Sequence, residues 1–153
     1  MKIYWKKLII ALLLPQLAGF IGSLFTTPKI SSWYSLIIKP SFNPPNWIFG
    51  PVWTLLFILM GIALYLVWIK KDNKLAITFF GIQLGLNTLW SILFFGLQSP
   101  LLALIEIFVL EIFILLTIKE FYKVSKKAAY FLLPYILWVS FAMILNFAIV
   151  ILN

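Results

Sequence analysis

The sequence predicts an all-α integral membrane protein, a five-transmembrane-helix bundle with an ordered, proline-rich loop between helices 1 and 2. Composition is the first reason. The 153 residues are 64% hydrophobic and 10% charged, with a mean hydropathy of +1.11, and a soluble domain of this size cannot bury so much apolar surface. Spacing is the second reason, because five apolar runs each approach the roughly 20 residues that a helix needs to cross a bilayer. We therefore expect a single transmembrane domain over residues 1–153.

Composition also excludes several classes of site. The chain has no cysteine and no histidine, which excludes disulfides, Cys/His metal sites, Ser-His-Asp triads and cysteine nucleophiles. We expect no metal site and no cofactor. The net charge of +8 comes from lysines that lie in short runs between apolar segments. A nucleic-acid-binding protein would gather them on one folded surface, so the lipid bilayer is the expected partner and nucleic acid is not.

The first helix is predicted over residues 5–26. The basic start at Lys2, Lys6 and Lys7, followed by an apolar run, is also typical of a secretory signal peptide. The run is long enough to cross a bilayer, however, and no A-x-A cleavage site follows it. We therefore expect this helix to be retained.

The other helices are predicted over residues 47–69, 75–97, 101–118 and 128–152. A lysine-rich turn ends the second helix, a Gln-Ser-Pro turn ends the third, and a basic turn that starts at Lys119 ends the fourth. Pro134 falls inside the last helix and predicts a kink or a locally unwound turn there.

Residues 27–46 are predicted to form an ordered lid over one end of the bundle. The stretch WYSLIIKPSFNPPNWIFGPVW, from Trp33 to Trp53, holds four of the eight prolines and three of the seven tryptophans. Each proline fixes φ and removes a backbone donor, so a helix does not continue through such a segment. In a membrane protein, irregular backbone lies outside the hydrocarbon or lines a protein cavity. We therefore expect function at the lid.

The lysines predict the orientation. Ten of the twelve lie in the N-terminal segment and in the turns after the second and fourth helices, and only Lys29 and Lys39 lie on the other side. The positive-inside rule then places the N-terminus in the cytoplasm and the lid and C-terminus outside.

The third predicted helix has two contrasting faces at about 100° per residue. Gly81 and Gly85 form a GxxxG pattern on one face, which lets another helix approach closely. We expect a homodimer through this face, with packing inside one bundle as the alternative. The opposite face carries Gln83, Asn87, Trp90 and Phe94, and it is expected to point inward because buried amides need partners in hydrocarbon.

A pocket is predicted where this inward face meets two other helices. They contribute Trp53, Phe57, Tyr135, Trp138, Ala142 and Asn146. A mostly aromatic lining with a few polar groups suits a flat, hydrophobic, partly polar ligand. The alternative is that the tryptophans are interface anchors, which fits Trp5 and Trp68 near span ends better than Trp90 and Trp138.

Two glutamates, Glu106 and Glu111, lie within the fourth predicted helix. An ionised carboxylate there is costly, so each must be protonated, partnered or near water. Their spacing separates them by about 140°, which disfavours a catalytic dicarboxylate pair. A structural hydrogen bond to a neighbouring helix is the favoured interpretation, and a proton relay is the alternative.

The sequence resembles the TspO/MBR family, also called translocator proteins or peripheral-type benzodiazepine receptors, over nearly the whole chain. The resemblance rests on Trp33-Tyr34, Lys39-Pro40-Ser41, Pro44-Pro45, Val52-Trp53, Gly61 with Ala63, Asn87, Trp90-Ser91, Phe94-Phe95-Gly96, Ala103 with Glu106, Pro134-Tyr135, Trp138, Phe141-Ala142 and Leu145-Asn146.

This resemblance implies five helices around a pocket closed by the first loop, usually in a homodimer. It implies binding of porphyrins such as protoporphyrin IX, and of isoquinoline carboxamide and benzodiazepine drugs. Together with the helix faces, it gives as expected ligand-binding residues Ser23, Tyr34, Pro44, Trp53, Asn87, Trp90, Leu93, Tyr135, Trp138 and Ala142. Trp53 and Trp138 also match indoles that the family links to light- and oxygen-dependent porphyrin breakdown, so they are the candidate catalytic residues.

The chain departs from the family pattern in two places. Glu106 stands where the family usually has Asp. The last helix ends in LNFAIVILN, with Phe147 and no basic residue, so it lacks the cholesterol-recognition pattern of animal members. The second departure argues against a sterol site and fits a bacterial member in the plasma membrane.

Three functions follow as hypotheses. The first is a membrane receptor or sensor for porphyrins, with the lid controlling entry. The second is an enzyme that degrades porphyrin under light. The third is a tetrapyrrole transporter, although such proteins usually show repeats and broken helices around a midplane site, and no repeat is visible here.

Overall fold

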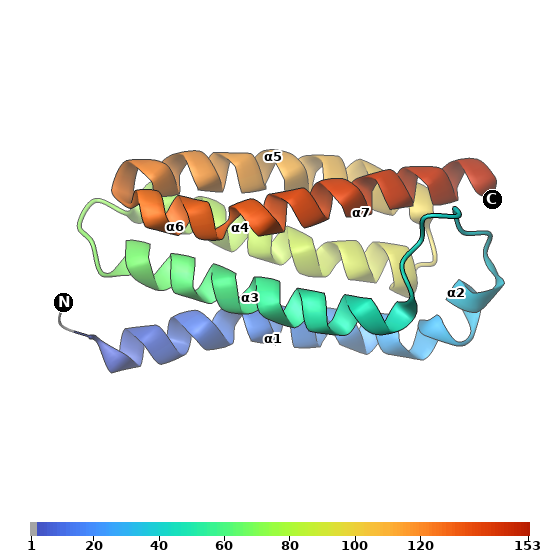
Figure 1. Cartoon of the computed structure of the whole chain (residues 1–153), viewed down its shortest axis with the longest axis horizontal. Helices are drawn as coiled ribbons and strands as arrows, with labels where there is room; N and C mark the ends of the chain where they lie inside the picture. Colours follow the sequence, from blue (N-terminus) through green and yellow to red (C-terminus); the bar gives the residue numbers. More distant parts are fainter. Residues whose placement is uncertain (1–2) are drawn as a thin grey trace.

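The computed structural model describes residues 3–153, and helices make up most of this part of the chain. Five of the helical segments are long and apolar enough to cross a membrane, which confirms the predicted fold class. Figure 1 shows them side by side along one axis, with the lid and the C-terminus at the same end. The elements in order are α1 (Trp5–Ile30), α2 (Trp33–Leu36), α3 (Asn46–Trp68), α4 (Lys74–Ser91), η1 (Ile92–Gly96), α5 (Pro100–Val124), α6 (Lys126–Phe131) and α7 (Leu133–Leu152).

Two helical ends differ from the sequence-based prediction. α1 continues to Ile30 with Pro28 inside its last turn, and only the rest of the lid is irregular or forms the single turn α2. Pro28 is tolerated there because the carbonyl that loses its partner lies near the helix end, where water and headgroups begin.

The prediction that a basic turn starts at Lys119 is wrong. α5 runs on to Val124, six residues past the expected end, and Lys123 forms an ion pair with Glu120 one turn earlier on the helix. Basic side chains near a helix C-terminus interact favourably with its dipole. The actual connection is Ser125, whose N–H donates to Phe121 and whose hydroxyl caps the next helix.

The last span is broken where a break was expected. α6 ends at Phe131 and α7 begins at Leu133, with Pro134 in its first turn. A proline is accommodated in the first helical turn because its missing N–H would have no partner there. The span over α4 ends in a second irregularity, the π-helical turn η1, where the N–H of Leu97 donates to Ile92 O at 2.8 Å.

The interior has two apolar clusters. The larger one joins buried side chains of α3, α4, α5, α6 and α7, including Met60, Phe80, Leu110 and Phe121. The smaller one lies at the lid end and contains Tyr34, Phe94, Phe95, Ala103 and Ile149. The functional cavity described below takes its walls from both clusters, so it lies between the packed core and the lid.

Candidate functional site

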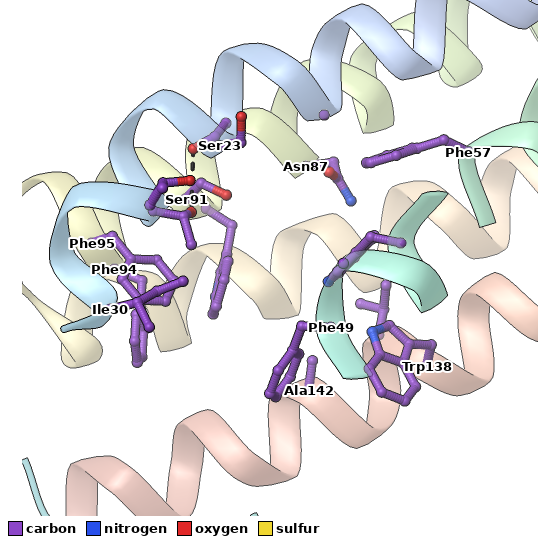
Figure 2. Close-up of a pocket in the computed structure, with 18 of the residues that line it drawn as sticks. Ser23, Ile30, Phe49, Phe57, Asn87, Ser91, Phe94, Phe95, Trp138 and Ala142 are labelled. Carbon is purple, nitrogen blue, oxygen red and sulfur yellow. Dashed lines mark hydrogen bonds between the residues drawn. The ribbon is translucent and has the colours of Figure 1, made fainter. Parts of the chain in front are cut away.

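A cavity of about 600 Å³ lies in the half of the bundle nearest the lid. Its walls come from α1, the lid, α3, α4, η1, α5 and α7, and most of its lining is apolar. The size falls within the range of small-molecule sites, which combine apolar walls with a few polar groups. Figure 2 shows Ser91 and Asn87 across the cavity from Phe49 and Ala142.

One wall is an aromatic cluster beneath the lid. The Trp90 ring stacks on Phe94 with centroids 4.8 Å apart, and Tyr34 lies at 5.6 Å from Phe95. Trp90 is also fixed by a hydrogen bond, because its indole N–H donates to Asn146 Oδ1 at 3.0 Å. Asn146 Nδ2 in turn donates to Pro100 O at 2.8 Å. This wall therefore has a fixed orientation before any ligand binds.

A second wall comes from α3 and α7. Trp53 stacks on Phe57 with centroids 5.5 Å apart, and Trp138 meets Phe49 edge to face at 6.1 Å. The indole N–H of Trp138 is buried and has no partner among the described residues. Buried donors without a partner are costly, so a ligand acceptor that reached this N–H would be stabilised.

Asn87 joins the cavity to a polar network inside the core. Asn87 Nδ2 donates to the Tyr135 hydroxyl at 3.0 Å, and that hydroxyl donates to Gln83 Oε1 at 2.8 Å. Asn87 uses only its Nδ2 in this network, so its Oδ1 can accept a hydrogen bond from a donor on a ligand. The amides predicted to point inward do so, and each has one hydrogen-bond partner in the Tyr135 hydroxyl. The Nε2 of Gln83 is buried without a partner among the described residues.

The lid is held by its own side chains. The Tyr34 hydroxyl donates to Asn43 Oδ1 at 3.1 Å. Lys39 Nζ donates to Tyr34 O at 2.6 Å and to Ile37 O at 2.9 Å, and it lies 4.7 Å from the Tyr34 ring centroid. Burial raises the pKa of Tyr34, and the Asn43 hydrogen bond lowers it by less. The phenol is therefore neutral at physiological pH and acts as a donor.

Seven of the ten expected ligand-binding residues line this cavity: Ser23, Tyr34, Trp53, Asn87, Trp90, Trp138 and Ala142. The other three do not. Tyr135 is fully buried behind Trp53, Leu93 packs into the lid-end cluster, and Pro44 lies in the lid without reaching the cavity. For Tyr135 the reason is its hydroxyl, which the amides of α4 hold inside the core.

Several lining residues were not expected from the sequence: Gln16, Thr26, Asn43, Asn46, Phe49 and Thr54. A polar stripe on α1 offered a signal, because Gln16, Ser23 and Thr27 recur at nearly helical spacing in an otherwise apolar segment. Asn43 and Asn46 gave no such signal, since periodicity says nothing about a loop.

The predicted dimer face is divided in the structure. An added Cβ at Gly81 or Gly85 would meet nothing within 4 Å, so this half of the stripe is open. Thr88, on the same face, instead donates to Ala18 O of α1 at 3.0 Å. The stripe therefore serves packing within the bundle at one end and is unoccupied at the other.

The two glutamates of α5 differ, and neither lines the cavity. Glu111 accepts a hydrogen bond from the Ser140 hydroxyl on α7, which matches the favoured interpretation of a structural bond between helices. Both carboxyl oxygens of Glu106 are buried without a partner among the described residues.

Comparison with known proteins identifies the family. A sequence profile of the TspO/MBR family matches residues 11–152. The chain is 51% identical to the "Tryptophan-rich protein TspO" of Archaeoglobus fulgidus, over 96% of this chain and 97% of that protein. It is 36% identical to the human "Translocator protein", over 90% and 84%, and 35% identical to the "Tryptophan-rich sensory protein" of Cereibacter sphaeroides, over 82% and 79%. The chain belongs to the TspO/MBR family.

Proposed function

We propose that this protein is a membrane receptor or sensor that binds porphyrins, such as protoporphyrin IX, and similar flat hydrophobic molecules in the cavity under the lid. The observation that carries the proposal is the pair of aromatic walls on either side of one cavity. Rings of the Trp90 wall and of the Trp53 and Trp138 wall offer faces and edges to a planar π system. The names of the relatives, which include a sensory protein and a translocator, support a receptor or sensor role.

The polar groups in the cavity lining favour an amphiphilic ligand over a pure hydrocarbon. Asn87 lies deep in the cavity, whereas Asn43, Asn46 and Thr27 lie at the lid end. A porphyrin carries its carboxylates on one edge and is apolar elsewhere. We expect that edge to face the lid, where amides and hydroxyls are available, because a carboxylate in the bundle interior would be costly.

Filling the cavity tests this function. Ala142 lines the cavity on α7, and Ala142→Phe would occupy the space of the ligand. Leu137→Phe is the matched control, because Leu137 lies on the same helix and is 70% exposed on the outer face. We expect wild type and Leu137→Phe to show saturable quenching of tryptophan fluorescence on titration with protoporphyrin IX, and Ala142→Phe to lose it. Equal quenching in all three folded proteins would contradict the assignment.

A second candidate function is light- and oxygen-dependent degradation of the bound porphyrin. The observation that favours it is that Trp53 and Trp138 line the same cavity. An excited porphyrin generates reactive oxygen from dissolved dioxygen, and an electron-rich indole next to it can be oxidised. In this function the double variant Trp53→Phe/Trp138→Phe binds protoporphyrin IX but no longer accelerates its loss under illumination. Trp68→Phe serves as a control, because Trp68 contacts Lys7 at the opposite end of the bundle.

We also propose a homodimer through the open part of α4, in a bacterial plasma membrane with the lid outside. Because an added Cβ at Gly85 meets no atom of its own chain, Gly85→Leu should leave the bundle intact and obstruct only a partner helix. We expect this variant to shift from dimer to monomer in light scattering of the purified protein. Leu115→Phe, on an exposed position of α5, should remain a dimer, and a dimeric Gly85→Leu would contradict the proposed interface.

A further inference from the structure

The contact between α1 and α3 changes along its length. Far from the lid the two helices touch backbone to backbone, because a Cβ on Gly61 would lie 2.7 Å from Ala11 O and 2.8 Å from Leu12 Cα. Tyr4 N and Lys7 Nζ also bond to Tyr65 and to Trp68 of α3 at this end. Further along, Gln16 Nε2 donates to Thr54 O at 3.3 Å. In the described residues, this is the last side-chain hydrogen bond between α1 and α3 before the lid.

Beyond that bond, side chains of both helices line the cavity and are also exposed on the outside of the bundle. Phe20 of α1 is 61% exposed and Trp47 of α3 is 74% exposed, and both line the cavity. Thr27, Asn46 and Gly50 are likewise both exposed and part of the lining, and so is Thr54 at the level of the bond itself. Residues that belong both to the lining and to the outer surface mark an opening, so the cavity opens sideways between α1 and α3.

The opening lies at a definite depth. Asn46 is the first residue of α3, and Thr54 lies eight residues on, which corresponds to about 12 Å along a helix. The hydrocarbon of a bilayer is about 30 Å thick. The rim therefore lies in the half of the membrane nearest the lid, where acyl chains and the inner edge of the headgroups surround it.

A route into the cavity past the lid, in contrast, is closed by hydrogen bonds. Asn153 makes two hydrogen bonds to the backbone of Ile38, each of 2.9 Å. Lys39 and the Tyr34–Asn43 bond tie the lid to itself. Entry past the lid would break several of these bonds, whereas entry between α1 and α3 past Gly50 would break none.

We propose that the ligand enters the cavity sideways from the lipid, through the opening between α1 and α3, while the lid stays closed. This inference rests on the proposed function and specifies the ligand class as an amphiphile that already resides in the lid-side half of the bilayer. The rim matches such a molecule, because Phe20 and Trp47 present apolar rings and Thr27, Asn46 and Gln16 present hydroxyl and amide groups. Gly50 leaves free space between them, since nothing lies within 4 Å of a Cβ placed there.

The test blocks the opening without touching the lid. Gly50→Phe places a ring in the opening, and Leu55→Phe is the matched control on an exposed position of α3 outside the cavity lining. Asn153→Ala releases the lid. Each protein is reconstituted in lipid nanodiscs and mixed rapidly with protoporphyrin IX, and the association rate constant is measured by tryptophan quenching. We expect Gly50→Phe to lower this constant by about tenfold, and Leu55→Phe and Asn153→Ala to stay within about twofold of wild type.

A second variant is expected to change the association rate constant in the opposite direction, so the test does not depend on a single substitution. Phe20→Ala widens the rim and should raise the association rate constant several-fold. A wild-type rate constant in both Gly50→Phe and Phe20→Ala, or a several-fold faster rate in Asn153→Ala, would overturn the side entrance and leave porphyrin binding in place. Absence of saturable quenching in the wild type would instead overturn the proposed function and this inference with it.

Discussion

The side-chain amide of Asn153 pairs with the backbone of Ile38 in the manner of neighbouring β-strands. Ile38 N donates to Asn153 Oδ1 at 2.9 Å, and Asn153 Nδ2 donates to Ile38 O at 2.9 Å. A third bond, from Asn153 Nδ2 to Ile149 O, fixes this amide on the end of α7. The lid is therefore attached to the last helix of the bundle, 115 residues away in sequence.

Asn153→Ala should loosen the lid. The change removes both bonds to Ile38, and each is worth about 0.5–1.5 kcal/mol. We expect the Ile38 amide to exchange its hydrogen about tenfold faster, which corresponds to about 1.4 kcal/mol of local opening free energy. Hydrogen exchange followed by mass spectrometry measures this. Ile151→Ala, on an exposed position of the same helix, should leave the exchange of residues 37–45 unchanged, and unchanged exchange in Asn153→Ala would contradict the attachment.

Tyr135→Phe should destabilise the bundle, although it removes only one heavy atom, the hydroxyl oxygen. The hydroxyl serves Asn87 and Gln83 together, so its loss leaves two buried amide groups without a partner. Unsatisfied buried groups cost about 1–3 kcal/mol, while a typical hydrogen bond within a membrane is worth only about 0.6 kcal/mol. We expect a loss of about 1–3 kcal/mol in unfolding free energy, measured by denaturation in detergent. Tyr130→Phe, at an exposed tyrosine, should change it by less than about 0.5 kcal/mol.

Gly61→Val should separate α1 from α3. The atoms that a Cβ would meet there, Ala11 O and Leu12 Cα, belong to the backbone and cannot rotate away as a side chain can. Overpacking of this kind costs about 1–3 kcal/mol, so a lower midpoint of thermal unfolding is expected. Gly50→Ala meets no neighbouring atom and should have a midpoint at or above that of wild type, because alanine favours helix. A wild-type midpoint in Gly61→Val would show that the contact is not needed.

Alkaline pH should weaken the lid through Tyr34. Burial raises the pKa of this phenol in the folded protein, so as pH rises the unfolded chain loses the proton first, at about pH 10. The contribution of Tyr34 to stability is therefore constant below about pH 10 and declines as pH rises from there toward the folded pKa. Thermal unfolding at a series of pH values should show a steeper alkaline decline in wild type than in Tyr34→Phe. Tyr122→Phe, at an exposed tyrosine, should follow wild type, and parallel profiles for all three proteins would contradict the role of Tyr34.

Much of the cavity could be predicted from helical periodicity. Asn87 and Trp90 lie on one face of α4, opposite Gly81 and Gly85, and a polar face within hydrocarbon must turn toward the protein. The same periodicity failed at Tyr135, because a helix face gives the direction of a side chain but not its depth. Here two amides on another helix hold the hydroxyl behind the cavity wall.

Helix ends were less predictable than helix positions. Lys119 and Lys123 follow the end of the apolar run, but α5 continues beyond that run to Val124. The backbone of a helix is satisfied in water as well as in lipid, so the end of an apolar run need not end the helix. The connection between α5 and α6 was decided by Ser125, whose capping bonds serve both helices.

The sequence by itself determined that the chain crosses a membrane five times, since only helices of apolar residues satisfy their backbone groups in hydrocarbon. It also determined which faces of those helices turn inward. Only the tertiary structure decided that the cavity opens sideways beside Gly50, and that Asn153 holds the lid. Both features join residues from distant parts of the chain, and such contacts depend on how the helices cross, which no local pattern of residues specifies.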